Sequence, residues 1–333
     1  MSARLAVSVG CPSGIGPEVS VVAAALAKGV RTLLVGDRGA IVRAAEARGV
    51  APSRLAHVDE PRFVRGKIAV WQPTDALGDR DRAPGRPSIR GGAAQLAWID
   101  AACDLVARGE ADALVTGPVS KEAIVRSRAP GSRAFLGHTE HLQRRLRAKE
   151  VVMAFAAPEL ITALVTTHLA LADVPRAITA QRVATAAYWL GWLVRRLRGA
   201  RARVGVASLN PHAGEGGLLG KEESQRIAPG IALARARLRR ASIATTLVGP
   251  LPAESVFRLA ARGEYHGVLA MYHDQATIPM KLLGFGEAVN VSLGLPIVRT
   301  SVDHGTAYDR AANFNADARG MREAMGLAAK LLR

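Results

Sequence analysis

The sequence has 333 residues, a formal net charge of +17, 49% hydrophobic residues and 4% aromatic residues. This length and composition predict a globular protein of two domains, and no apolar run of about eighteen residues predicts a membrane span. The 38 Arg and 7 Lys are scattered along the chain, and aromatic residues that could stack on bases are few. We therefore expect neither a nucleic-acid nor a membrane partner, and we ascribe most of the charge to a solvated surface.

The two cysteines, Cys11 and Cys103, show no spacing typical of a metal site. The apolar run before Gly10 is too short for a signal peptide. A reduced, cytoplasmic location is therefore expected.

Strand and helix patterns alternate along the chain, which predicts an α/β fold with mostly parallel, covered sheets. Residues 3–9 have the pattern of a first strand, and the turn GCPSGIGPE leads into a helix to about residue 28. This turn lacks the GxGxxG spacing, so a standard Rossmann site is not favoured. The segment 113–124 predicts a strand, a Gly-Pro turn and a helix that begins at Ser120, and later helices are predicted at 92–108, 179–197 and 318–332.

The segment 271–309 has the highest density of polar side chains set between apolar anchors. Its preceding run GVLAMYH predicts a short buried strand that ends near His273 and Asp274. Because the ends of strands present polar side chains to clefts, we interpret this segment as one wall of an active site.

Three histidines each follow an apolar strand: His168 after LVTT, His212 after VASLNP, and His273 after LAMY. In a parallel sheet all three would lie along one edge. One such histidine alone is more often a hydrogen-bonded structural residue, but three at equivalent positions predict a metal site with open coordination positions.

Candidate anion-binding residues lie around these strands. The sequence GHTE places His138 and Thr139 after a glycine, although Thr139 as a helix cap explains the pattern equally well. Lys281, Asn290 and Arg299 are further donors, and Arg299 lies within an apolar strand pattern, where a buried guanidinium requires an anionic partner. Lys121, placed against the dipole at a helix start, and Asp274 are the candidates for a general base.

The stretches GIGPE, TGPVSK, GHTE, TTHLAL, LNPHAGEGG, GPLPAES, YHDQ, GFGEAVNVSLGLP and RTSVDHGTA occur in this order from Gly14 to Ala307. In these stretches the chain resembles the 4-hydroxythreonine-4-phosphate dehydrogenase family. The resemblance implies two α/β/α domains like those of isocitrate and isopropylmalate dehydrogenases, with the active-site cleft between them. We place the first domain at 1–125 and 288–333, and the second at 126–287.

The resemblance also implies a site, a reaction and an assembly. A divalent metal (Zn²⁺, Mg²⁺ or Co²⁺) would be held by His168, His212 and His273, and an anionic phosphorylated substrate by His138, Thr139, Lys281, Asn290 and Arg299. Gly294, Ser301, Asp303 and His304 are the candidate cofactor-binding residues. The implied reaction is the NAD- or NADP-dependent oxidation and decarboxylation of 4-phosphooxy-L-threonine to 3-amino-2-oxopropyl phosphate, in pyridoxal 5'-phosphate biosynthesis. A homodimer with shared active sites is implied as well.

Two positions depart from the family pattern. Cys11 stands where the family usually has Asp, and Glu254 stands where Asp is common. These departures leave open a related dehydrogenase that acts on another hydroxy acid or on a dihydrodiol carboxylate. A non-catalytic phosphate- or nucleic-acid-binding protein is the alternative of another class, and it would require a clustered basic face rather than three histidines at strand ends.

Overall fold

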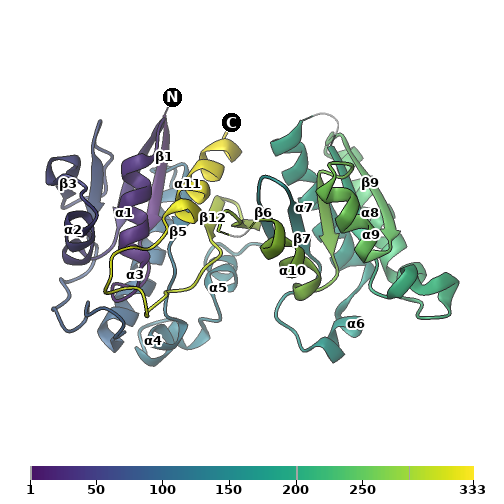
Figure 1. The fold of residues 1–333 in the computed structure, drawn as a ribbon, viewed down its shortest axis with the longest axis horizontal. Coiled ribbons are helices and arrows are strands. Elements are labelled where there is room, and N and C mark those ends of the chain that lie inside the picture. Colours follow the sequence, from purple (N-terminus) through teal and green to yellow (C-terminus); the bar gives the residue numbers. More distant parts are fainter. Residues whose placement is uncertain (1, 200–201, 285) are drawn as a thin grey trace. The chain divides into compact units, whose positions relative to one another are not determined.

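The computed structural model describes residues 2–199, 202–284 and 286–333, and the chain forms two compact units whose elements are labelled in Figure 1. Unit 1 comprises Met1–Lys149 and Leu295–Arg333, and unit 2 comprises Glu150–Gly294. Residues 126–149 therefore group with unit 1, whereas the sequence placed them in the second domain. Residues 288–294 group with unit 2, whereas the sequence placed them in the first.

Local contacts explain both differences. In residues 126–149, His141 Nε2 lies 2.6 Å from Asp100 Oδ1, and Arg145 pairs with Asp104 at 2.7 Å, which fixes helix α5 (His138–Arg145) to α3 (Ile89–Ala107). In residues 288–294, strand β11 (Val289–Leu293) pairs antiparallel with β6 (Val152–Ala156). The boundaries thus follow side-chain pairing and strand pairing, which local sequence patterns do not specify.

Unit 1 contains a parallel sheet in the order β3-β4-β2-β1-β5-β12 among its described residues. Its strands, rich in branched apolar residues as buried parallel strands are, have these bounds: β1 Ala3–Ser8, β2 Val30–Val35, β3 Leu55–Val58, β4 Ile68–Trp71, β5 Ala113–Thr116 and β12 Val298–Val302. The remaining helices of the unit are α1 Gly16–Leu26, α2 Arg38–Ala47, α4 Lys121–Arg126 and α11 Arg319–Leu331, with 3₁₀ turns η1 Pro52–Arg54 and η2 Ser132–Ala134. The predicted α/β class is confirmed.

Side-chain caps begin the helices where the sequence predicted them. Ser120 accepts a hydrogen bond from the Ala123 amide and so begins α4, which places Lys121 in its first turn. The turn between β5 and α4 requires a glycine, because a Cβ at Gly117 would lie 2.5 Å from the Val9 carbonyl oxygen. This close approach sets the end of β5 against the end of β1.

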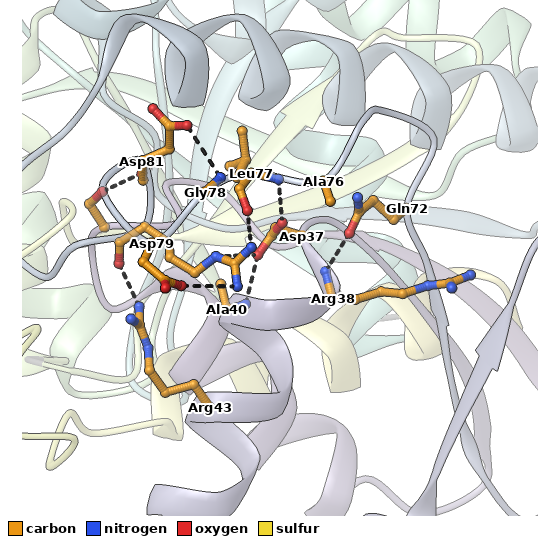
Figure 2. Close-up of polar contacts among 12 residues, drawn as sticks. Asp37, Arg38, Ala40, Arg43, Gln72, Ala76, Leu77, Gly78, Asp79 and Asp81 are labelled. Carbon is orange, nitrogen blue, oxygen red and sulfur yellow. Dashed lines mark hydrogen bonds and ion pairs between the residues drawn. The ribbon is translucent and has the colours of Figure 1, made fainter.

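A polar network holds the turn after β2, as Figure 2 shows. Asp37 is fully buried, and its carboxylate accepts hydrogen bonds from the amides of Ala40 (2.7 Å) and Leu77 (3.2 Å). Arg82 Nε lies 3.3 Å from the same carboxylate, and its guanidinium also donates to the Leu77 carbonyl. A buried carboxylate and an arginine thus balance each other and fix the loop that precedes α3.

Unit 2 contains a mixed sheet in the order β11-β6-β7-β10-β8-β9 among its described residues. Strand β6 runs antiparallel to both of its neighbours, β11 and β7, and β7, β10, β8 and β9 run parallel to one another. Its other elements are β7 Ile161–Leu164, β8 Ala202–Ala207, β9 Thr245–Leu251, β10 Gly267–Ala270, η3 Leu171–Asp173, α6 Val174–Ala177, α7 Ala180–Arg198, η4 Pro211–Gly217, the π-helical turn η5 Glu223–Ile227, α8 Ala228–Arg240, α9 Ala253–Ala261 and α10 His273–Leu283. Thr179 caps α7, as predicted. None of the helices in the described ranges combines enough length and apolar character to cross a membrane.

Candidate active site

The three histidines of unit 2 follow three neighbouring parallel strands. β10 pairs in parallel with β7 on one side and with β8 on the other. His168 follows β7, His273 is the first residue of α10 directly after β10, and His212 lies in η4 after β8. The prediction that these strand ends share one edge of a sheet is confirmed, because parallel strands all end on the same side.

His168 and His273 approach each other closely at this edge. Their ring centroids are 5.6 Å apart, and the ring planes are inclined by 42°. His273 Nδ1 lies 2.7 Å from Asp274 Oδ1. A neutral imidazole that donates its Nδ1–H to this carboxylate leaves the Nε2 lone pair available to a metal, which is the usual arrangement of a metal-binding histidine. Asp274 is therefore placed to orient His273.

Two polar residues that the sequence analysis missed hold these strand ends together. The Thr166 hydroxyl donates to the Met271 carbonyl at 2.7 Å, which joins the end of β7 to the end of β10. Gln275 accepts from the Met271 amide at 2.6 Å and donates to the Ser208 carbonyl at 2.8 Å, which joins β10 to β8. Thr166 lies in the stretch TTH and Gln275 in the stretch YHDQ, each just after a strand. That position after a strand was the signal in the sequence that could have identified them.

His212 lies in a strained segment of backbone. Residues His212, Ala213, Gly214, Glu215 and Gly216 all have positive φ angles, of 53, 55, 81, 44 and 66°. Non-glycine residues rarely adopt this region, and such strain persists only where surrounding contacts impose it. Here the buried Glu223 carboxylate accepts from the amides of Leu209 (2.9 Å) and Asn210 (2.8 Å), which anchors the start of the segment.

Within one chain, the histidines at this edge of the sheet provide only part of a metal-binding site. Two imidazoles, one of them oriented by a carboxylate, suit a divalent transition metal. Across the described residues, however, no group of three or more His, Cys, Asp and Glu side chains is gathered closely enough to hold a metal ion. His212 shares the edge without completing a three-histidine set.

Unit 1 contains a cluster of basic side chains, which we call the cationic cluster: Lys121, His138 and Arg299. Arg299 lies in β12, as predicted, and is only 3% exposed. Its Nη2 donates to the Thr116 hydroxyl at 2.6 Å, at the end of β5. Burial lowers the pKa of Arg299 to about 10, against the opposing influence of Glu140, so the guanidinium stays charged at neutral pH. Thr116 was missed by the sequence analysis, where it appeared only as the last residue of a strand.

His138 and Lys121 belong to the same cluster. Burial, together with the nearby positive charges of Arg299, His141 and Lys121, holds the pKa of His138 well below its usual value. Its Nε2 is buried and has no hydrogen-bond partner among the described residues. Lys121 Nζ reaches within 3.7 Å of the place where a Cβ on Gly137 would be. A buried donor or acceptor left open beside a buried cation is suited to an anionic or polar ligand.

Gly137, rather than Thr139, is the N-cap residue of α5. The interpretation of Thr139 as a helix cap is therefore wrong, because Thr139 lies inside the first turn and is buried. Thr139 follows His138 in the first turn of α5, and the backbone amides at the start of a helix also attract anions.

The other candidate residues are distributed over the two units. In unit 2, Lys281 is exposed in the last turn of α10, and Asn290 lies in β11 with its Oδ1 buried and without a hydrogen-bond partner in the described ranges. In unit 1, Ser301 is buried near the end of β12, and Asp303 and His304 are exposed just beyond it. Their place at the carboxyl end of a parallel strand is typical of ligand-binding residues in α/β proteins.

Gly294 is the last residue of unit 2 and has a φ angle of 89°. A Cβ there would lie 2.6 Å from the Glu150 carbonyl oxygen. Both the backbone conformation and the lack of space thus require glycine at this position.

The two departures from the family pattern have different surroundings. Cys11 is buried, with its Sγ 3.5 Å from the Tyr308 hydroxyl. Burial raises the pKa of the Cys11 thiol and is the main cause that raises the pKa of Tyr308 to about 12, so both groups are neutral at physiological pH. Glu254, in contrast, is exposed in the first turn of α9, where a hydrogen bond from Ser255 lowers its carboxyl pKa. Of the two departures, only Cys11 places a neutral side chain at a buried position where the family pattern has an aspartate.

Comparison with known proteins identifies the family. Residues 28–328 match the family model described as pyridoxal phosphate biosynthetic protein PdxA. The chain belongs to the PdxA family. A 4-hydroxythreonine-4-phosphate dehydrogenase of Geobacter metallireducens is 41% identical over 99% of this chain and 96% of its own length.

Solved structures of relatives share the fold of this PdxA-family chain. The 4-hydroxythreonine-4-phosphate dehydrogenase of Klebsiella pneumoniae superposes with a TM-score of 0.82 at 32% identity and covers 100% of both chains. A terephthalate 1,2-cis-dihydrodiol dehydrogenase of Burkholderia xenovorans superposes with a TM-score of 0.67 at 26% identity over 98% of both chains. The same fold thus occurs in dehydrogenases named for phosphorylated and for non-phosphorylated substrates.

Proposed function

We propose that this chain is a 4-hydroxythreonine-4-phosphate dehydrogenase, which oxidises and decarboxylates 4-phosphooxy-L-threonine to 3-amino-2-oxopropyl phosphate with NAD as the oxidant. The observation that carries the proposal is the 41% identity to a dehydrogenase of this name over 99% of the chain. In this reaction the substrate carbon gives a hydride to the nicotinamide and its hydroxyl gives a proton to a base. The resulting ketone then loses CO₂, and the electrons of the broken bond are protonated in the product.

The cationic cluster is proposed to bind the anionic groups of the substrate, together with Thr139, Lys281 and Asn290. Arg299 supports this role because it is buried and yet keeps its charge, so its planar fork is pre-organised for a phosphate or carboxylate. His138 supports it because its buried Nε2 is open to a ligand. Lys121 and Asp274 stay the candidates for the base. Lys121 Nζ lies beside the start of α5 and would have to act as the neutral amine to accept the hydroxyl proton.

His168, His273 and His212 are proposed to hold a divalent metal. A divalent metal held by these residues would supply Lewis-acid chemistry to a hydroxyl and a neighbouring carbonyl. Within the chain, Asp274 fixes the ring of His273 and Gln275 fixes the start of α10, so both act as positioning residues. Gly294, Ser301, Asp303 and His304 are the proposed cofactor-binding residues.

A homodimer that completes the metal site is proposed as well. Helix α10, which begins at His273, exposes three apolar side chains: Ile278 is 59% exposed, Leu282 80% and Leu283 42%. Contiguous exposed apolar side chains of this kind are typical of surfaces that a partner covers. A second copy that covers α10 would bring its own histidines near this edge, which accounts for the incomplete set within one chain.

Substrate specificity is tested with a panel of hydroxy acids, with and without a 4-phosphate, followed by NADH absorbance. We expect turnover of 4-phosphooxy-L-threonine, with Arg299→Lys raising KM because the fork is lost while the charge is kept. The exposed Arg258→Lys, which lies on α9 in unit 2, is the matched control and should leave KM unchanged. Turnover of a non-phosphorylated diol carboxylate instead would favour the dihydrodiol alternative, and no turnover of any member would contradict the proposal.

Shared sites are tested by mixing two inactive variants, His212→Ala and His273→Ala. If each site draws histidines from both chains, heterodimers contain one intact site, and activity returns to at most about a quarter of wild type. Heterodimers purified through two different affinity tags that show no activity would mean that each chain builds its site alone.

A further inference from the structure

Unit 2 contains a pocket of about 850 Å³ between α8 and β9, at the end of the sheet opposite to the histidines. Ala202 and Arg203 at the start of β8 and Thr245, Thr246 and Leu247 at the start of β9 contribute to its lining. Because β8 and β9 run parallel, their first residues lie at the amino edge of the sheet, whereas His212 follows the carboxyl edge. The pocket is therefore separate from the candidate active site.

Three arginines line this pocket: Arg203, Arg235 and Arg239. No acidic residue belongs to the lining, and within the described part of the chain none of the three forms an ion pair. Some arginines elsewhere in the described chain do form one, as Arg82 does with the buried Asp37. A pocket lined by three arginines and by no carboxylate has an excess of positive charge nearby, which attracts anions.

Two of these arginines are already held in place. The guanidinium of Arg203 lies 5.3 Å from the centre of the Tyr265 ring, in a cation–π contact. Arg235 Nη2 donates to the Leu247 carbonyl at 2.8 Å. Each guanidinium carries five N–H donors, so these contacts orient the groups and leave most donors for a ligand. Pre-organised donors lose less conformational entropy on binding.

The helix dipole accounts for only part of this arrangement. Cations are favourable in the last turn of a helix, and Arg239 lies in the last turn of α8. Arg203, however, lies on a strand, and Arg235 lies earlier in α8. The presence of these two arginines in the lining is therefore not explained by the dipole.

We propose that this pocket binds a phosphorylated small molecule, whose phosphate is held by arginines of the lining and whose apolar part packs on Leu238 and Ile243. The volume falls within the range typical of small-molecule sites. Arginine suits the ligand because its fork matches phosphate oxygens in a bidentate geometry. The proposal does not depend on the substrate of the active site.

The test uses pyrophosphate as the probe, with calorimetry at low ionic strength on the full chain. Arg203→Gln/Arg239→Gln removes two pocket charges and keeps Arg235, which bonds to the backbone. The control, Arg258→Gln/Arg262→Gln, removes two exposed charges of the same unit that do not line the pocket. We expect the pocket variant to bind the probe about tenfold or more weakly and the control to bind like wild type.

A second readout separates this pocket from the cationic cluster, which also attracts anions. Arginine modification by phenylglyoxal, located by mass spectrometry, should be reduced by pyrophosphate at Arg203 and Arg239 and unchanged at Arg258. Turnover and melting temperature of the pocket variant should match wild type. Equal pyrophosphate binding by the pocket and control variants, or no protection of Arg203 and Arg239, would overturn the proposal. Loss of binding to a short DNA duplex with unchanged pyrophosphate binding would also overturn it, because the ligand would then be a nucleic-acid backbone.

Discussion

Arg299 allows a quantitative test of the cost of a pre-organised anion site. Burial lowers its pKa from 12.5 to about 10. At 1.36 kcal/mol for each pH unit, burial of this charge costs ~3 kcal/mol of the free energy of unfolding. The folded-state pKa lies below the unfolded-state pKa, so the cost is present in full below about pH 10 and declines to zero as the pH rises from there to the unfolded-state value of 12.5. It is therefore present at pH 7.

Replacement of the charge should stabilise the chain most when its partner is replaced too. Arg299→Met alone removes the ~3 kcal/mol cost but leaves the buried Thr116 hydroxyl without its 2.6 Å hydrogen bond, which costs about 1–3 kcal/mol. Thr116→Val removes that hydroxyl with a side chain of similar shape. We expect Arg299→Met/Thr116→Val to be about 1–3 kcal/mol more stable than wild type, after about 1 kcal/mol for imperfect repacking.

Urea unfolding at pH 7 with wild type, both single variants and the double variant measures these differences. Thr116→Val alone should be less stable than wild type, because it deprives a buried guanidinium of its acceptor. Phosphate at about one hundred times its Kd for the cationic cluster should stabilise wild type by about 2.7 kcal/mol more than it stabilises the double variant. A double variant less stable than wild type, or one that phosphate stabilises equally, would refute the reasoning.

Two further predictions concern groups outside the cationic cluster. Cys11 and Cys103 should not react with a thiol reagent in the native protein, because burial raises both thiol pKa values, that of Cys103 to about 12; rapid reaction before unfolding would contradict this. Arg237 lowers the pKa of Glu150, with which it forms hydrogen bonds of 2.8 and 2.7 Å, so this contribution to stability is present above the unfolded-state pKa and is lost as the pH falls through the folded-state value. Glu150→Gln should therefore lower the melting temperature at pH 7 and have less effect below about pH 4, and an equal effect at both pH values would contradict the assignment.

The sequence by itself determined the elements and the class of the fold. Apolar runs of four to six residues became buried strands, and the capping residues Ser120 and Thr179 begin α4 and α7 where they were predicted. These features depend on neighbours a few residues away, so the local pattern suffices. The shared edge of the three histidines also followed from sequence, because in any parallel sheet residues after the strands lie on the same side.

Tertiary structure alone decided which of these residues meet. The order β7-β10-β8 places His273 between the other two strand ends, and at that edge His168 is the histidine that packs against its ring. It also decided that Gly137 caps α5 and that Arg299 is buried against Thr116, 183 residues away in sequence. Strand order and burial depend on pairings between distant segments, whose free energies are set by the whole core and leave no periodic signal in the local sequence.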